Sequence, residues 1–207
     1  TTGTLLDTPD KGAKSLGDLV SWKEVQQMYE SAWEDEWFDS KAEQEEYRKQ
    51  GNEQLKRVYE NESKLNTLPF ALEEPFMLKV DEWQIKGAID RIDVDGDTVE
   101  LIDYKTGKQR EKMDPKKEET LQLRMYQLAL MQDKRFAKKK FVLSYYFITN
   151  GKKVSFSADR AILDGTREHI IELCNAIEAS DFKATPSQFI CGTCDFYDIC
   201  QFRAEKR

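Results

Sequence analysis

Histidine and cysteine are scarce in this sequence, whose 207 residues include one histidine and four cysteines. With so few cysteines and no secretory signal at the N-terminus, we exclude a disulfide-stapled secreted domain and expect a cytoplasmic protein. No apolar run approaches the ~20 residues that span a membrane, so we expect no membrane partner. The chain also begins without methionine, and we therefore expect it to be a piece of a longer protein or a trimmed one.

A uniformly basic character is absent too. The formal net charge is −7, which argues against a surface coated in lysine and arginine for non-specific binding to nucleic acids. An acidic balance is compatible with a site that holds divalent cations. Basic residues are still concentrated in places, where they form either solvated helix ends or a rim that contacts phosphates: Lys116, Lys117, Lys134, Arg135, Lys138, Lys139 and Lys140.

No glycine-rich phosphate loop is present, which excludes a motor driven by nucleoside triphosphates within this segment. What the chain does contain is 39% hydrophobic residues in regular patterns, enough for one domain with its own core. Their spacing predicts helices, three strands, a helix, two strands and a helix, in that order. The expected helices cover about residues 19–29, 40–63, 120–133 and 164–180, and the expected strands about 70–80, 83–94, 98–106, 141–149 and 153–157.

This order of elements predicts an α/β fold with a central mixed β-sheet flanked by helices. We expect a loop and helical region over residues 1–66, a core over residues 67–180, and a cysteine-rich tail over residues 181–207 that packs on the same domain. In the helix at 120–133, the predicted inward face contains Leu121, Met125 and Leu128. In the helix at 164–180, the predicted inward residues are Ile170, Ile171, Leu173, Cys174 and Ile177.

The dipeptide Asp95-Gly96 is a strong signal for a two-residue hairpin loop between the second and third strands. Paired around that loop, Asp90 lies opposite Leu101 and shares a face with Asp103 and Lys105. The two aspartates are then diagonal neighbours, roughly 7–8 Å apart at the backbone. We expect the pair formed by Arg91 and Glu100 on the other face to be structural, and we expect Asp93 to point away from Asp90.

Asp103 lies in the otherwise apolar strand segment Leu101–Tyr104, where an unpaired carboxylate is unfavourable. Repulsion from Asp90 adds to that penalty, so a metal ion or Lys105 has to compensate for it. A simple ion pair between Asp103 and Lys105 at a strand end is the plainer interpretation. The second carboxylate on the same face favours a shared metal ion instead.

The blocks Gly87–Asp93, Ile102–Gly107 and Gln122–Tyr126 together resemble the signature of RecB-type nucleases in the PD-(D/E)XK superfamily. The block Cys191–Cys200 resembles that family's C-terminal cysteine motif. The resemblance covers about two thirds of the chain. Within the family, the chain is most similar to the nuclease domains fused to UvrD/PcrA-like or AddAB-type helicases. The resemblance implies a restriction-endonuclease-like core, an exonuclease acting on single-stranded DNA in repair or recombination, and a linked helicase as partner.

The resemblance also implies roles for individual residues. Asp90 and Asp103, with the carbonyl of Tyr104, would ligate Mg²⁺ or Mn²⁺, for which oxygen ligands are suited. Lys105 would position or deprotonate the attacking water. Gln122 and Tyr126, four residues apart on one helix and flanking its apolar face, would contact the DNA backbone or steady the site.

Two departures from the family pattern concern its metal ligands. The family's early histidine is missing, because the only histidine is His169 on a late helix, where we expect a structural role. Relatives with a 4Fe–4S cluster use four cysteines, of which Cys191, Cys194 and Cys200 match three. A missing upstream segment explains both absences. In that case Cys174 is a buried structural thiol, and the rival hypothesis is a zinc site that uses it.

Two other functions remain open from the sequence. A catalytically inactive nuclease-like module could grip DNA within a helicase complex, which the missing histidine favours and the intact Asp90, Asp103 and Lys105 oppose. A cysteine-dependent interaction module without a DNA role would leave the aspartates and lysine unexplained.

Overall fold

The computed structural model describes residues 14–36, 38–65, 67–107, 111–180 and 182–204. The chain divides into two compact units, Thr1–Arg167 and Glu168–Arg207, each of which is described by itself. Among the described residues, no helix is both long and apolar enough to cross a membrane.

Three helices precede the sheet in the first unit: α1 (Leu16–Leu19), α2 (Trp22–Ser31) and α3 (Lys41–Glu62). Ser21 begins α2 with a capping box, because its hydroxyl accepts from the Glu24 N–H while the Glu24 carboxylate accepts from the Ser21 N–H. The ring of Tyr29 lies over Gly51 of α3, and its hydroxyl donates to the Arg48 carbonyl at 2.9 Å. A side chain at position 51 would collide with that ring, so glycine permits the close packing of α2 on α3.

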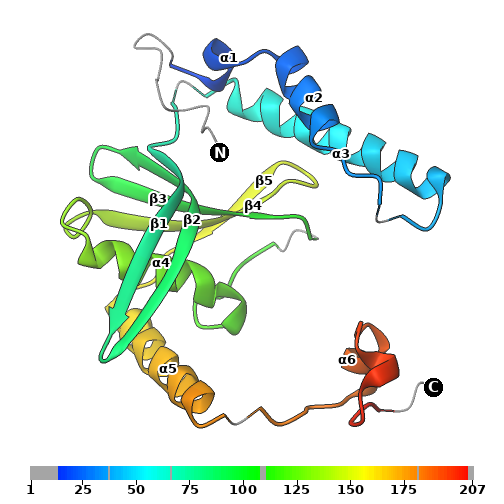
Figure 1. Cartoon of the computed structure of the whole chain (residues 1–207). Coiled ribbons are helices and arrows are strands. Elements are labelled where there is room, and N and C mark those ends of the chain that lie inside the picture. Colours follow the sequence, from blue (N-terminus) through cyan, green and yellow to red (C-terminus); the bar gives the residue numbers. More distant parts are fainter. Residues whose placement is uncertain (1–13, 37, 66, 108–110, 181, 205–207) are drawn as a thin grey trace. The chain divides into compact units, whose positions relative to one another are not determined.

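The sheet has five strands in the order β1-β2-β3-β4-β5 (Figure 1). They are β1 (Ala71–Val80), β2 (Trp83–Asp95), β3 (Thr98–Lys105), β4 (Lys140–Phe147) and β5 (Lys152–Phe156). Strands β3 and β4 pair in parallel, and all other neighbours pair antiparallel. A short 3-10 turn, η1 (Glu118–Thr120), and helix α4 (Leu121–Gln132) form the crossover between β3 and β4. The prediction of a mixed sheet flanked by helices is confirmed.

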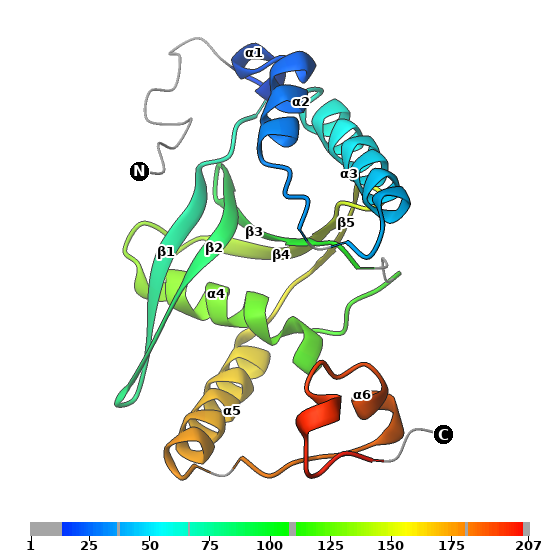
Figure 2. The ribbon, with the colours of Figure 1, turned by 45° about the vertical axis from the view of Figure 1, so that its right-hand side comes forward.

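The two faces of the sheet are covered by different helices (Figures 1 and 2). Helix α4 packs on one face, where Leu123, Tyr126 and Leu130 join the main apolar core. The end of α3 lies on the other face, where Asn61 donates to the Gly151 carbonyl and Glu62 pairs with Arg91. The sheet is therefore buried on both sides near its middle, which is typical of a strand order with a parallel crossover.

The expected loop of the β2–β3 hairpin, Asp95-Gly96, was wrong, because the loop lies one residue later in the sequence. Asp95 pairs with Thr98, so the loop consists of Gly96 and Asp97, with Gly96 at a φ of 52°. This register sets Ile92 opposite Leu101. The expected register would have placed Ile92 opposite Val99 and Val94 opposite Asp97. Pairing of apolar side chains and the left-handed glycine explain the difference.

The expected inward face of α4 was also wrong. Its buried residues are Leu123, Arg124, Tyr126, Gln127, Ala129 and Leu130. The predicted residues Leu121, Met125 and Leu128 are only half-buried. The helix is hydrophobic around most of its circumference, so periodicity alone did not select the correct face.

Helix α5 (Arg160–Glu178) begins in the first unit and ends in the second, which also contains α6 (Gln188–Gly192) and the 3-10 turn η2 (Tyr197–Ile199). The buried stripe of α5 contains Leu163, Thr166 and Ile170. Leu173 and Ile177, which we expected to be inward, are exposed. The helix begins four residues earlier than expected, and its buried stripe lies correspondingly earlier in the sequence.

Candidate active site

Asp90 and Asp103 lie on adjacent strands of the first unit. Arg91 pairs with Ile102, so the next step along the two strands brings Asp90 beside Asp103. Moving the hairpin loop by one position changes the register by two residues, which leaves both aspartates on the face we expected. They are direct neighbours instead of diagonal ones, and the Asp90 carboxylate accepts a hydrogen bond from the Tyr104 N–H at 3.0 Å.

Asp103 is almost completely buried, with 2% of its surface exposed. Burial raises the pKa of its carboxyl, Lys105 lowers it, and the negative charge of Asp90 raises it further. Lys105 Nζ lies 2.6 Å from Asp103 Oδ2 as an ion pair. The ammonium is therefore the partner that compensates this buried oxygen.

Lys105 joins the two aspartates to α4. Its ammonium donates to Gln122 Oε1 at 3.1 Å, and Gln122 Nε2 donates to the Tyr126 hydroxyl at 2.8 Å. The ammonium also lies 5.0 Å from the centre of the Tyr145 ring, within range of a cation–π contact. The structure thus brings Asp103, Lys105, Gln122 and Tyr126 into one line of contacts that begins next to Asp90.

Tyr126 does not flank the apolar face of α4, as expected, but belongs to the buried core and is 5% exposed. Burial raises the pKa of its hydroxyl, Gln122 lowers it, and the negative charges of Asp103, Asp90 and Glu73 raise it.

The opposite face of the same strands carries a buried ion cluster. Arg91 donates to both oxygens of Asp93 at 2.8 Å, to Glu62 at 2.6 Å and to the Tyr104 hydroxyl at 3.4 Å. The expected pair of Arg91 with Glu100 was wrong, because the corrected register sets Arg91 opposite Ile102. Glu100 pairs instead with Lys153 of β5 at 2.8 Å.

The Tyr104 side chain belongs to that opposite face, so only its carbonyl can serve the aspartates. The residues present fit a hard divalent cation in their chemistry, because they offer the carboxylates of Asp90 and Asp103 and a backbone carbonyl. Mg²⁺ commonly uses one or two carboxylates and keeps several waters. No three His, Cys, Asp or Glu residues of the described chain are gathered closely enough to hold an ion by themselves.

The basic residues that could contact phosphates are partly neutralised within the protein. Arg135 pairs with Asp133 at 2.7 Å and with Glu74 at 2.8 Å. Lys139 donates to the Gly96 carbonyl and lies 3.6 Å from Asp97. These two side chains support the loops at the end of the sheet, which favours the structural interpretation for them.

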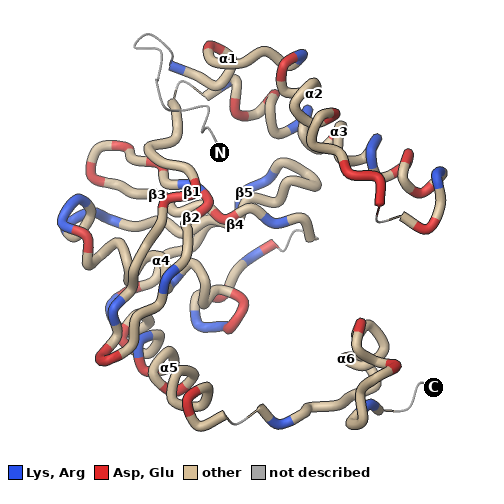
Figure 3. The backbone as a smooth tube through the Cα atoms, in the orientation of Figure 1, with Lys and Arg blue, Asp and Glu red and all other residues tan. Residues whose placement is uncertain are grey.

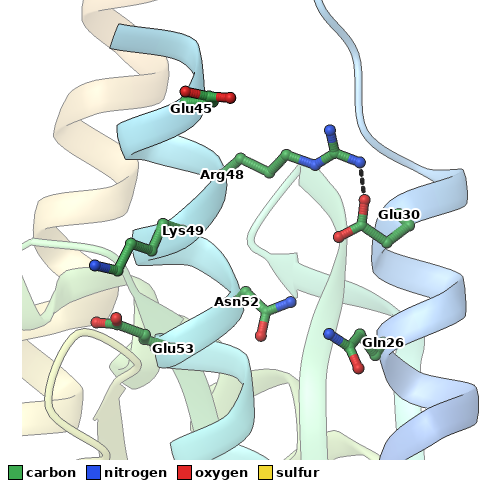
Figure 4. Close-up of a pocket in the computed structure, with 7 residues that line it drawn as sticks. All are labelled: Gln26, Glu30, Glu45, Arg48, Lys49, Asn52 and Glu53. Carbon is green, nitrogen blue, oxygen red and sulfur yellow. Dashed lines mark hydrogen bonds and ion pairs between the residues drawn. The ribbon is translucent and has the colours of Figure 1, made fainter. Parts of the chain in front are cut away.

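A polar hollow between α2 and α3 is separate from the predicted site residues (Figure 4). An ion pair between Arg48 and Glu30 crosses it. It is lined by Gln26, Glu30, Glu45, Arg48, Lys49, Asn52 and Glu53.

The cysteine-rich tail lies in the second unit, with Cys191 buried in α6 and Cys194 and Cys200 half-buried. The Cys191 sulfur accepts from the Ala204 N–H at 3.4 Å. Cys174 is half-buried on α5, not buried as expected. All four are free thiols. His169 Nδ1 lies 3.6 Å from the Glu172 carboxylate on the same helix.

The sequence profile of the PD-(D/E)XK nuclease superfamily matches residues 8–201. Gene 69 protein of Mycobacterium phage L5 is 30% identical over 136 residues, which are 63% of this chain and 44% of that protein. The chain therefore spans less than half of that relative's length.

Among solved structures, the crystal structure of SSO0001 is similar with a TM-score of 0.41 and 18% sequence identity. The alignment covers 89% of this chain and 95% of that chain.

Proposed function

The chain belongs to the PD-(D/E)XK nuclease superfamily, and we propose that it is a metal-dependent deoxyribonuclease with Asp90, Asp103 and Lys105 at its active site. The observation that carries this proposal is the line of contacts from Asp103 through Lys105 and Gln122 to Tyr126. This line joins the block Ile102–Gly107 to the block Gln122–Tyr126. Its first residue, Asp103, lies beside Asp90 of the block Gly87–Asp93.

The two aspartates would hold the cation, together with the Tyr104 carbonyl. When bound, Mg²⁺ or Mn²⁺ would polarise the scissile phosphodiester and lower the pKa of an attacking water. Asp103 is buried beside Asp90, and burial raises its pKa. A cation at this position offsets both the burial and the repulsion between the carboxylates, which gives the site a reason to bind one.

Lys105 would act on the phosphate and the water. Its side chain is 37% exposed, while Asp103 and Gln122 hold its ammonium in place. The ammonium can therefore offset negative charge on the substrate and orient the water that attacks phosphorus. Gln122 and Tyr126 keep the ammonium in this position from α4, and the exposed part of Gln122 can contact the DNA backbone.

Finer assignments rest on the resemblance in the sequence blocks. We propose an exonuclease on single-stranded DNA, linked to a helicase in cytoplasmic DNA repair or recombination. We also propose that the core extends over residues 67–180 and that Cys191, Cys194 and Cys200 hold a structural 4Fe–4S cluster in a longer protein, with a fourth cysteine upstream. The missing histidine ligand would then lie upstream too.

Cleavage of end-labelled single-stranded DNA tests the proposal. The wild-type chain with Mg²⁺ or Mn²⁺ should shorten the DNA, and both EDTA and Asp103→Ala should abolish cleavage while most DNA binding remains. Asp164→Ala is a matched control, because that aspartate forms an exposed ion pair with Arg160 on α5. DNA binding without cleavage, by this chain and by a longer protein carrying the upstream segment, would favour the inactive DNA-gripping module.

A further inference from the structure

The side chain of Tyr145 contacts both Lys105 and the segment that carries Gln122. Tyr145 lies on β4, where it pairs in register with Asp103 of β3. The Lys105 ammonium lies over its ring, 5.0 Å from the ring centre. Its hydroxyl donates to the Glu119 carbonyl at 2.7 Å, in the turn η1 that leads into α4. We propose that Tyr145 is a positioning residue that sets the ammonium with its ring and the start of α4 with its hydroxyl, an inference that rests on the proposed function.

The Lys105 ammonium is contacted from three elements. Asp103 Oδ2 of β3 lies 2.6 Å away, and Gln122 Oε1 of α4 accepts a hydrogen bond at 3.1 Å. The ring of Tyr145 lies under the ammonium from β4, and the negative face of an aromatic ring attracts a cation. An ammonium has three donors. Asp103 and Gln122 use two of them, so the third stays available for a phosphate or for the attacking water.

The elements that hold Lys105 from above and below carry few charges of their own (Figure 3). Helix α4 has one charged residue, Arg124, and β4 has none after Lys140. The ion pair with Asp103 does not fix the direction of the ammonium, because a lysine head is a point charge on a flexible stem. Lys105 is also 37% exposed, so it can swing into solvent unless uncharged contacts hold it. The phenol ring and the Gln122 amide are those contacts.

The Tyr145 hydroxyl acts on the other partner of this contact. Tyr145 is 1% exposed, and a hydroxyl at that depth is unfavourable unless it forms a hydrogen bond. Burial raises the pKa of the hydroxyl and the negative charge of Asp103 raises it further, so the group stays protonated and donates to Glu119. Gln122 follows three residues later. The hydrogen bond therefore fixes the backbone from which the Gln122 amide reaches Lys105.

A second buried side chain holds the same segment. Arg124 is 5% exposed, and its guanidinium donates to the Lys117 carbonyl at 3.0 Å and to the Thr166 hydroxyl at 2.6 Å. The segment before α4 is thus held at two backbone carbonyls, one by Arg124 and one by Tyr145. Of these two side chains, Tyr145 also contacts the ammonium, so it joins the position of the helix to the position of the lysine.

Cleavage of end-labelled single-stranded DNA with Mn²⁺ tests the inference when kcat and KM are measured separately. Tyr145→Phe keeps the ring and removes the hydroxyl, and Tyr145→Leu removes both. We expect kcat to fall about 10-fold in the first variant and about 100-fold in the second, because a misplacement of about 1 Å near the reacting atoms can cost about 10²-fold. KM should change less than about 2-fold, since interactions made only in the transition state affect kcat.

Tyr146 offers a matched control on the same strand. It is 3% exposed, and it lies on the opposite face, where its ring packs on Tyr104 and its hydroxyl accepts from Asn61. Tyr146→Phe and Tyr146→Leu remove the same groups from an equally buried place. Their midpoints of urea unfolding should fall as much as those of the Tyr145 variants, but their kcat should stay within about 2-fold of the wild type. All rates are compared at a temperature at which circular dichroism shows every variant folded.

Nuclear magnetic resonance tests the ring without metal or substrate. An aromatic ring shields protons that lie over its face, so the ε-methylene protons of Lys105 should resonate upfield of those of exposed lysines. Lysine labelled with ¹³C at Cε makes these protons visible, and Lys105→Arg assigns them. The upfield shift should persist in Tyr145→Phe and in Tyr146→Leu, and it should be lost in Tyr145→Leu.

The possible failures are distinguishable. If the wild type cleaves DNA and both Tyr145 variants keep its kcat, the proposed function stands and the role of Tyr145 is wrong. An equal loss of kcat in Tyr145→Leu and Tyr146→Leu, or a Lys105 resonance without an upfield shift in the wild type, would assign Tyr145 to the core alone and overturn the inference. Without cleavage by this chain and by a longer protein carrying the upstream segment, the proposed function is wrong and the role of Tyr145 falls with it.

Discussion

Asp103 is a buried carboxyl whose pKa is raised above its ordinary value of 3.8 by burial and by Asp90, against the effect of Lys105. A raised pKa in the folded state means that the folded protein binds the proton more tightly than the unfolded chain does. The stabilisation from this group is therefore fully present below about pH 3.8 and is lost as the pH rises through the folded pKa.

We predict that Asp103→Asn, measured in EDTA, removes this loss. The difference in the free energy of unfolding, variant minus wild type, should increase as the pH rises from about 4 to about 7. Urea titrations at several pH values measure it. Asp133→Asn is the control of opposite sign, because Arg135 lowers the pKa of Asp133 and its stabilisation is lost as the pH falls. Parallel pH profiles for Asp103→Asn and the wild type would contradict the prediction.

The Tyr126 hydroxyl holds Gln122, which holds Lys105. Tyr126→Phe removes one hydrogen bond and should lower the free energy of unfolding by about 0.5–1.5 kcal/mol. We expect a larger effect on cleavage, with kcat about 10-fold to 100-fold lower, because the ammonium is no longer fixed beside Asp103. The comparison is Tyr47→Phe, whose ring is 54% exposed on α3. Equal kcat for both variants would show that the line of contacts is not used in catalysis.

At the scale of elements, the ion cluster of Arg91, Asp93 and Glu62 ties α3 to β2. Arg91 is 4% exposed, so its removal leaves carboxylates in a mostly buried place. Arg91→Met should lower the free energy of unfolding by about 3–5 kcal/mol. Arg160→Ala, which breaks an exposed pair, should cost less than about 1 kcal/mol. Urea unfolding measures both, and similar losses would contradict this account of the cluster.

The sequence was sufficient to predict the strands and most helices of this fold, because each has its own hydrophobic period. It was not sufficient for the hairpin register, because Asp95-Gly96 and Gly96-Asp97 are both acceptable two-residue loops. Only the pairing of Ile92 with Leu101 distinguishes them. The prediction that Asp90 and Asp103 share a face of the sheet was still correct, because the pairing register shifted by two residues and side chains alternate with a period of two. The predicted ion-pair partner of Arg91 was wrong. Its partner Glu62 lies on a helix 29 residues away in sequence, which strand pairing cannot predict.

At the scale of the whole molecule, the site residues come from three separate sequence blocks, and periodicity could not relate them. The contact of Lys105 with Gln122 forms only because α4 packs on the face of the sheet that carries Lys105, which hydrophobic periodicity does not specify. The burial of Tyr126 depends on Phe76 of β1, whose ring centre lies 5.3 Å away.

The cysteine-rich tail permits a test of the two metal hypotheses. If Cys191, Cys194 and Cys200 form the C-terminal part of a cluster site, Cys174→Ser should leave the metal content of the purified protein unchanged, and Cys194→Ser should reduce it. If a zinc site uses Cys174, both variants should lose the metal equally. Elemental analysis of iron and zinc in the purified protein measures the difference, and equal loss would contradict the cluster hypothesis.

The parallel pairing of β3 with β4 also affects the order in which the molecule folds. The hairpin of β2 and β3 involves only local contacts, but β4 can join it only after α4 has been made and has crossed the sheet. Closing that connection is slow compared with forming a hairpin. A chain leaving the ribosome would therefore carry Asp90 and Asp103 on a solvent-exposed hairpin until Phe147 has emerged. We expect the nascent protein to complete its site late in synthesis, when Lys105 and Gln122 first meet.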